Sequence, residues 1–448
     1  MRAGQAAGLC LTGIVGVAVA EQHRPGRRVL SQGGISANII MSVFCYTALD
    51  CRSMEIAMEE SFENGHDDEG RRVAGEVATI EQDWGVVTAM LPAQWQSKAV
   101  ELGALRRLRG FKSAEALLRV LLIHLADGCS LRETAVRARA GDLADVSDVA
   151  LLKRLRGCGP WFQWMIQEMA ANMSLSMAPN TLLPGRPVRL IDGSVVCEPG
   201  ATGSTWRLHY ALNLHALSCD EVHVTEATEG ESLTRFAIQA GDIVMGDRGF
   251  ANRRGVRHVV QYHGDVVLRM NLTNLPLEDQ QGQSLALLPL LRTLAIGQAA
   301  DWAARMRDEQ GTIPVRVCAY KKTLAQALAA QEAIRREAAK KHREVKPETI
   351  EAAGYVIVLT TLMPPTAEAI MEFYRRRWQV ELAFKRLKSL LQLGHLKKVD
   401  KDGAKAWLQG KLLVACLIET LILTAERFSP WGYPRDERRL AASALALA

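Results

Sequence analysis

The chain has 448 residues, 48% of them hydrophobic and 23% charged, which is the composition of a globular protein longer than one typical domain. Its net charge of +6 and pI near 8.8 are compatible with binding to nucleic acid but do not require it. The nine cysteines form no C-x-x-C pair and no zinc-ligand spacing, so the pattern excludes a zinc-finger scaffold and indicates free thiols in a reducing cytoplasm.

Residues 1–53 differ in character from the rest of the chain. One arginine precedes a short apolar stretch with an A-x-A pattern ending at Ala20, which is typical of a secretory signal. The stretch is too short to span a bilayer. Three interpretations stay open: translation of non-coding sequence upstream, a real signal, or a disordered leader. We expect an atypical leader that is disordered or not genuine, with the recognisable protein beginning near Met54 or Met58.

The next segment, residues 54–182, is predicted to form an all-helical domain. Apolar residues recur there at helical spacing. The expected helices cover residues 93–107, 113–126, 130–140 and 148–159. Ser113 and Ser147 are the expected N-caps, and Ser130 opens an S-x-x-E capping box.

The last two of these helices have the lengths of a helix-turn-helix. The second would expose Lys153, Arg154 and Arg156. One interpretation is a helix-turn-helix-like motif that reads DNA ends, and the other is a helical bundle whose basic residues are simply solvated.

After Pro187 the pattern changes from helices to strands. Three β-prone runs come first, followed by a predicted helix, an apolar strand, a second helix and a fifth strand. These segments are residues 188–196, 206–216, 221–228, 232–240, 242–247, 252–263 and 265–270. A three-stranded antiparallel meander followed by a helix and a parallel strand is the order of a ribonuclease H-like fold.

Two aspartates stand at or near the ends of predicted buried strands. Asp192 lies in VRLIDGSVV and Asp247 in GDIVMGDRGF, and each is followed or preceded by glycine. An aspartate beside glycine at a strand end is most often a turn residue. A third carboxylate in a helical context makes the set more informative than either aspartate alone.

That third carboxylate is Glu381. Tyr374, Arg377, Glu381 and Lys388 are spaced by three, four and seven residues, which places them on one face of a predicted single helix. Six Lys or Arg residues and one Glu lie in this run, which indicates a phosphate-binding face that Lys397 and Lys398 extend. A stripe that would pack on a core lies beside it, consisting of Phe373, Val380, Phe384, Leu387 and Leu391.

The long interval between Asp247 and Glu381 predicts an insertion at residues 271–352. We expect strands near residues 300–307 and 313–320, a basic helix at 324–343, and then the strand YVIVLTTL. Trp302 is either a base-stacking residue or a core tryptophan, and the core is the favoured interpretation.

These motifs together resemble those of a DDE transposase of the insertion-sequence-four type, whose signature is Tyr, two residues, Arg, three residues, Glu, six residues, Lys. The match at residues 374–388 has no gap, and the DGS-like strand, the WRLHY stretch and the DRGF-like turn match as well. The resemblance covers about residues 80–435. It implies a helical DNA-binding domain and a ribonuclease H-like, mixed-sheet α/β catalytic domain. It also implies a mainly β insertion that helps to hold the hairpin or flipped end of the DNA.

Three carboxylates in such a site can hold two Mg²⁺ or Mn²⁺ ions about 4 Å apart for in-line displacement at a phosphodiester. We expect Asp192, Asp247 and Glu381 to be the catalytic metal ligands. The expected DNA contacts are Tyr374 (through its hydroxyl), Arg377, Lys388, Arg248 and Lys385. No Walker or G-x-G-x-x-G motif is present, so no nucleotide cofactor is expected.

The resulting hypothesis is a metal-dependent transposase that binds terminal inverted repeats and joins them to target DNA. It would be cytoplasmic, associated with the nucleoid, independent of membranes, and dimeric on paired ends. The alternatives are a catalytically silent DNA-binding remnant or repressor, and a structure-selective nuclease. The expected segments are a leader (1–53), a DNA-binding domain (54–182), two catalytic halves (183–270 and 353–429), an insertion (271–352) and a tail (430–448). The tail departs from the family pattern, for which truncation or a frame change is our interpretation.

Overall fold

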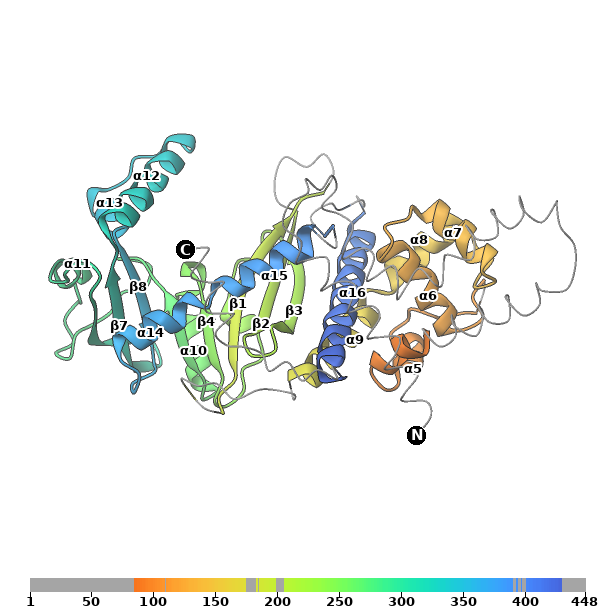
Figure 1. The fold of residues 1–448 in the computed structure, drawn as a ribbon, viewed down its shortest axis with the longest axis horizontal. Coiled ribbons are helices and arrows are strands. Elements are labelled where there is room, and N and C mark those ends of the chain that lie inside the picture. Colours follow the sequence, from red (N-terminus) through yellow and green to blue (C-terminus); the bar gives the residue numbers. More distant parts are fainter. Residues whose placement is uncertain are drawn as a thin grey trace, which may run out of the picture. The chain divides into compact units, whose positions relative to one another are not determined.

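The computed structural model describes residues 84–428, except 109, 175–182, 184, 199–204, 390–391, 394–395 and 397–399 (Figure 1). The expected leader and tail therefore lie outside the described residues, as do Leu391, Lys397 and Lys398. The chain forms two compact units. Among the described residues, one contains those up to Met165 and from Asp400 onward, and the other contains those within Ile166–Val399.

The first unit is helical within the described residues. Its helices are α5 (Trp95–Glu101), α6 (Ala114–Leu125), α7 (Leu131–Ala140), α8 (Asp148–Gly157), the start of α9 (Gly159–Ser174) and α16 (Lys401–Phe428). The three expected N-caps are confirmed, because each serine side chain accepts a hydrogen bond from the backbone N–H three residues later. The predicted helix at 93–107 is too long. Helix α5 ends at Glu101, and the chain turns at Gly103, whose φ of 81° continues no right-handed helix.

Helix α16 belongs to this helical unit and not to the catalytic half in which its residues were expected. It packs against α6 and α8, and Arg156 of α8 donates to Asp400 at 2.9 Å. Residues Lys401–Leu423 are long and apolar enough to cross a membrane by length and composition. However, 72% of the most apolar part of this helix is buried inside the protein, as expected of a core helix.

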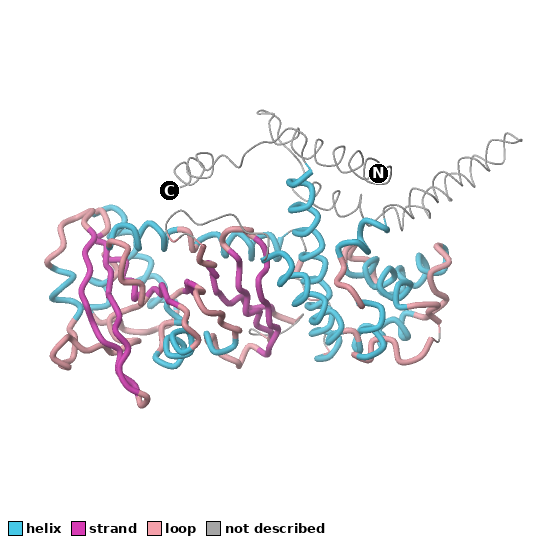
Figure 2. The backbone as a smooth tube through the Cα atoms, turned by 90° about the horizontal axis from the view of Figure 1, so that it is seen from below, coloured by secondary structure: helices cyan, strands magenta, loops and turns pink. Residues whose placement is uncertain are grey.

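The second unit is built on one eight-stranded sheet in the order β3-β2-β1-β4-β5-β8-β7-β6 (Figures 1 and 2). Its strands are β1 (Val188–Val196), β2 (Trp206–Asn213), β3 (Ser218–Glu226), β4 (Ile243–Gly246), β5 (Asp265–Arg269), β6 (Ala299–Asp308), β7 (Gly311–Lys321) and β8 (Tyr355–Thr360). The first three form an antiparallel meander, and β4 and β5 continue the sheet in parallel with β1. This arrangement confirms the predicted ribonuclease H-like order of the strands.

The two faces of this sheet are covered by different helices. Ile191 of β1 and its partner Ala211 of β2 lie in the apolar core that also contains Val256 and Val259 of α10 (Arg253–Gln261). Neighbouring residues of a strand point to opposite faces, so Asp192 and its partner Tyr210 face away from α10. On that face lies α15 (Trp378–Ser389), which contacts β1 and β2.

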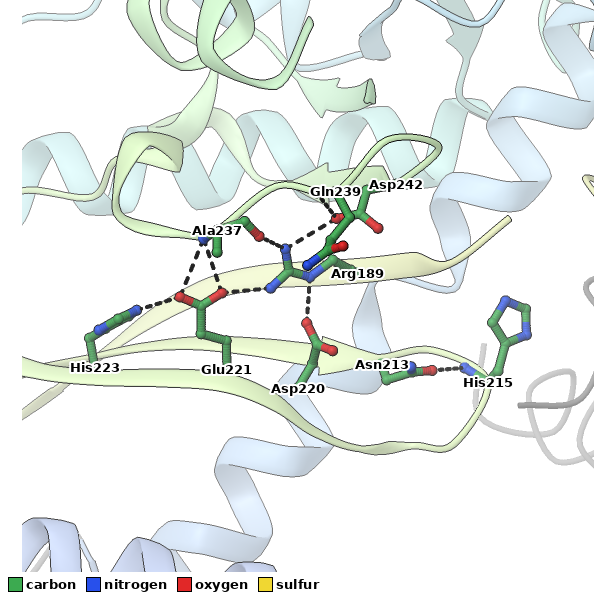
Figure 3. A network of polar contacts seen from close by, with 9 residues as sticks. All are labelled: Arg189, Asn213, His215, Asp220, Glu221, His223, Ala237, Gln239 and Asp242. Carbon is green, nitrogen blue, oxygen red and sulfur yellow. Dashed lines mark hydrogen bonds and ion pairs between the residues drawn. The ribbon is translucent and has the colours of Figure 1, made fainter. Parts of the chain in front are cut away.

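A buried cluster around Arg189 explains one prediction that was wrong, the helix at residues 232–240. Only a short 3₁₀ turn forms there, η2 (Leu233–Arg235). The Arg189 guanidinium lies between Asp220, Glu221 and Asp242 (Figure 3). It also donates to the carbonyl of Ala237, whose own N–H donates to Glu221. Backbone groups that a helix would pair internally are thus bonded to this cluster, and the segment stays extended.

The expected insertion joins the main sheet and does not form a sheet of its own. Strand β8 pairs with β5, and the β6–β7 hairpin continues the sheet from β8. Trp302 is partly buried and packs against the core, in agreement with the favoured interpretation. Two short helices, α11 (Leu287–Arg292) and α13 (Pro347–Ala352), accompany the hairpin. Helix α12 (Leu324–Lys340) projects from the sheet in Figure 1, and none of its side chains is buried.

Candidate active site

Parallel pairing of β1 and β4 brings the two predicted aspartates together. Ile191 is paired with Gly246, so the residues that follow, Asp192 and Asp247, lie beside each other. Asp192 accepts a hydrogen bond from the N–H of Gly193 at 2.7 Å. Asp247 caps the 3₁₀ turn η3 (Arg248–Phe250) by accepting from the N–H of Gly249 at 2.8 Å.

The neighbouring carboxylates of Asp192 and Asp247 repel each other. Burial raises the pKa of Asp192 to about 6, although the N–H of Gly193 and the Arg377 guanidinium oppose the rise. The charges of Asp247 and Glu231 raise the pKa of Asp192 further. A bound cation relieves repulsion of this kind, and a set of carboxylate oxygens is what Mg²⁺ and Mn²⁺ prefer.

The signature residues do not lie on one helix, which corrects the prediction for residues 374–388. Helix α14 (Ala367–Arg375) ends before α15 begins, and the N–H groups of Arg376 and Arg377 bond to carbonyls three residues earlier. A turn with such tight bonds breaks the register of a single helix. The predicted apolar stripe is confirmed at Phe373, Val380, Phe384 and Leu387, which are all buried. Phe384 packs against Tyr210, the strand partner of Asp192.

Because of this turn, Tyr374 points into the protein. Its ring is buried, and its hydroxyl donates to the carbonyl of Gly246 at 3.4 Å, next to Asp247. Burial raises the pKa of Tyr374 to about 12. This position does not favour the expected hydrogen bond from the Tyr374 hydroxyl to the DNA backbone. We interpret Tyr374 as a tether between the end of α14 and the end of β4.

Loss of this tether is expected to cost stability and not DNA affinity. Tyr374→Phe removes the bond to Gly246 and should lower the free energy of unfolding by about 1 kcal/mol. Urea denaturation measures this change, and Arg375→Gln, which alters an exposed neighbour, serves as control. If Tyr374→Phe instead leaves stability unchanged and weakens DNA binding, Tyr374 contacts DNA, as expected from the sequence.

Arg377 connects the third carboxylate to the first. One terminal nitrogen lies 3.5 Å from Asp192 Oδ2, and the other donates to Glu381 Oε1. Burial by itself would lower the pKa of Arg377, but the surrounding Tyr374, Glu381 and Asp192 raise it overall. The Glu381 side chain is 59% exposed, so most of it faces solvent.

The expected metal ligands are therefore only partly assembled. Within the described parts of the chain, no group of three His, Cys, Asp or Glu side chains is arranged to hold a metal ion. Asp192 and Asp247 come together directly, and Glu381 is linked to them through Arg377. A guanidinium between two carboxylates shows that this place attracts positive charge, so the donor set fits a divalent cation.

The other predicted DNA contacts lie near this site to different degrees. Arg248 follows Asp247 and is exposed, as is Lys385 on α15, and Lys388 is half-buried. Sequence reasoning missed two further cations, Arg269 at the end of β5 and Lys322 after β7. Burial lowers the pKa of both side chains, and the charge of Arg248 lowers both further. Arg269 follows the strand partner of Gly246, so strand register was the signal that would have found it.

The fold and this site define a class of protein. A meander followed by parallel strands, with one aspartate within the first strand, a second just after its parallel neighbour and a glutamate on a covering helix, is the arrangement of a ribonuclease H-like enzyme that acts on polynucleotides. Residues 184–417 match the family described as the transposase DDE domain. The chain therefore belongs to the DDE transposases, of the insertion-sequence-four type.

Similar proteins agree with this assignment. InsL for insertion sequence element IS186A of Escherichia coli strain K12 is 34% identical over 78% of this chain and 96% of its own length. The transposase for insertion sequence element IS421 of Escherichia coli is 34% identical over the same shares. A cryo-EM structure of a piggyBac transposase synaptic complex with hairpin DNA is a distant likeness. Its TM-score is 0.37, with 11% identity over 76% of this chain and 72% of that chain.

The chain is thus a DNA-cleaving transposition enzyme of an insertion sequence, and its partner is DNA. Enzymes of this family generally use divalent metal ions.

Proposed function

We propose that this transposase recognises the terminal inverted repeats of its own element, cuts the DNA at those ends and joins them to target DNA. The observation that carries the proposal is the pair of neighbouring aspartates, Asp192 within β1 and Asp247 just after β4, with Arg377 joining Asp192 to Glu381. Acidic ligands beside half-buried cations are suited to a phosphodiester, because the cations would neutralise phosphate charge where the carboxylates hold metal.

Asp192, Asp247 and Glu381 are the proposed ligands of two Mg²⁺ or Mn²⁺ ions. Held by these residues, such ions would supply activation of the attacking oxygen and stabilisation of the departing 3′ oxygen. The chain's part is to position the groups. Tyr374 holds the end of α14 against β4, and the turn before α15 directs Glu381 toward the same side of the sheet as Asp192. Full assembly requires Arg377 to move from between Asp192 and Glu381, which would free its guanidinium for a DNA phosphate.

The proposed DNA contacts surround this site. Arg377, Arg248, Lys385 and Lys388 keep the role expected for them, and Arg269 and Lys322 join them. The support is electrostatic, because the charges of Arg248 and Arg269 act on Lys322, and that of Arg377 acts on Arg269. Such crowding of like charges is relieved by a bound phosphate. Two DNA ends can be bound and cut by two copies of the chain, so we propose a homodimer on paired ends. We propose that it acts in the cytoplasm, associated with the nucleoid.

A cleavage assay with duplex DNA tests the proposal. With Mg²⁺, the chain should nick a duplex that carries an end of the element, and should bind that duplex at least about a thousandfold more tightly than unrelated DNA. Equal cutting of unrelated duplexes would show a structure-selective nuclease. Specific binding without any cutting would show the silent remnant or repressor.

A further inference from the structure

We propose that Glu231 is a fourth carboxylate of the metal site, and that Gly193 and Gly249 lack side chains to admit it. Glu231 lies in the loop between β3 and η2, away from the signature residues in sequence. The inference rests on the proposed metal ligands Asp192 and Asp247, and it adds a ligand from the opposite face of the sheet.

The two glycines stand next to the two aspartates and leave room for Glu231. A Cβ added at Gly193 would lie 2.5 Å from Glu231 Oε1, and one added at Gly249 would lie still closer to Oε2. A side chain at either position would force the Glu231 carboxylate to shift. The motifs DGS and DRG thus each contain a metal ligand and, beside it, a gap into which the carboxylate of Glu231 reaches.

The gap at Gly193 explains how Glu231 reaches the site. Gly193 follows Asp192 on β1 and therefore faces the other side of the sheet, where η2 and α10 lie. On that side the Glu231 carboxylate lies against the backbone of Gly193. Any other residue at this position would place a side chain there.

The position of Glu231 beside Asp247 supports the same arrangement. The hypothetical Cβ of Gly249 lies close to Glu231 Oε2 and 3.2 Å from Asp247 Oδ1. The two carboxylates therefore lie within the reach of ions that are bound about 4 Å apart.

An ion pair with Arg207 is the one competing role. Arg207 of β2 donates to Glu231 Oε1 at 3.1 Å, and the Glu231 side chain is 25% exposed. The other oxygen, Oε2, is the one beside Gly249. One oxygen can thus be held by Arg207 while the other contacts a cation, as is common for metal ligands that are oriented by a second hydrogen bond.

Mn²⁺ binding to the full chain, measured by electron paramagnetic resonance without DNA, tests the proposal independently of activity. Glu231→Gln should weaken Mn²⁺ binding by about tenfold or more. Gly193→Ala should weaken binding to a similar extent, because the new methyl group displaces the Glu231 carboxylate. Gly230→Ala is the matched control, since a Cβ there meets nothing within 4 Å, and its affinity should stay unchanged.

Two further variants separate the outcomes. Asp192→Asn should also weaken Mn²⁺ binding; if it binds Mn²⁺ like the wild type, the proposed metal site itself is wrong. If Asp192→Asn weakens binding and Glu231→Gln does not, the site stands and the role of Glu231 is overturned. Arg207→Gln removes the ion pair and should retain Mn²⁺ binding. Equal loss of Mn²⁺ affinity in Arg207→Gln and Glu231→Gln would contradict the proposal. It would show that Glu231 acts only as the ion-pair partner of Arg207.

Discussion

Asp192→Asn is expected to abolish strand cleavage and strand transfer, with a loss of about a thousandfold or more. Asparagine keeps the shape of the side chain and its hydrogen bond from Gly193 but carries no charge to hold a cation. A metal ion contributes several kcal/mol of transition-state stabilisation, and about 1.4 kcal/mol corresponds to a factor of ten in rate. Nicking of an end-bearing duplex in Mg²⁺ measures the loss.

Binding of the same duplex should be retained, because Asp192 contributes no positive charge to DNA recognition. Glu381→Gln should lose cleavage to the same degree if the third carboxylate joins the first two during catalysis. The control is Asp142→Asn, whose carboxylate is 92% exposed and pairs with Lys112 in the helical unit. If Asp192→Asn cleaves DNA at the rate of this control, Asp192 is not a catalytic residue.

Asp192→Asn should also stabilise the folded protein at neutral pH, by up to about 3 kcal/mol. Burial raises the pKa of Asp192 from 3.8 to about 6, so the folded chain binds this proton more tightly than the unfolded chain. Stability from this group is therefore fully present below about pH 4 and is lost as the pH rises through about 6. An uncharged asparagine at this position would avoid the loss, so the difference in free energy of unfolding should grow across that interval.

Urea denaturation at several pH values without added metal measures this difference. The gain of Asp192→Asn over wild type should be largest near neutral pH and approach zero near pH 4, whereas Asp142→Asn should show no such trend. A difference that is constant with pH, or a loss of stability at pH 7, would contradict the argument. Added Mg²⁺ should reduce the gain, because a cation stabilises the ionised wild-type carboxylate and has less to bind in the variant.

Much of the site follows from local features of the sequence. Serine caps, strand periodicity and the buried stripe around Val380 and Phe384 depend on neighbours within a few residues, and the structure agrees with them. That Asp192 and Asp247 belong to one site was implied by the family resemblance. Parallel pairing of β1 with β4, which only the structure shows, then brings them side by side.

Other features depended on contacts between residues far apart in the chain. The segment at residues 232–240 has helical propensity, but the buried cluster of Arg189 binds its backbone and holds it extended. The apolar pattern of α16 predicts that this helix is buried, but it does not predict which elements cover it. Only the tertiary packing shows that α16 belongs with the N-terminal helices. The turn between α14 and α15 likewise leaves no mark in the periodicity, although it moves Tyr374 away from Glu381.

The sequence by itself determined the family, the order of the catalytic strands and the choice of three candidate carboxylates, because these depend on residue type and short-range spacing. The tertiary structure alone decided that Arg377 joins Asp192 to Glu381, that the Tyr374 hydroxyl bonds to Gly246, and that Glu231 lies beside two glycines. The physical reason is that burial and ion pairing depend on which surfaces meet in the folded chain. Residue spacing carries no information about partners that lie dozens of residues away.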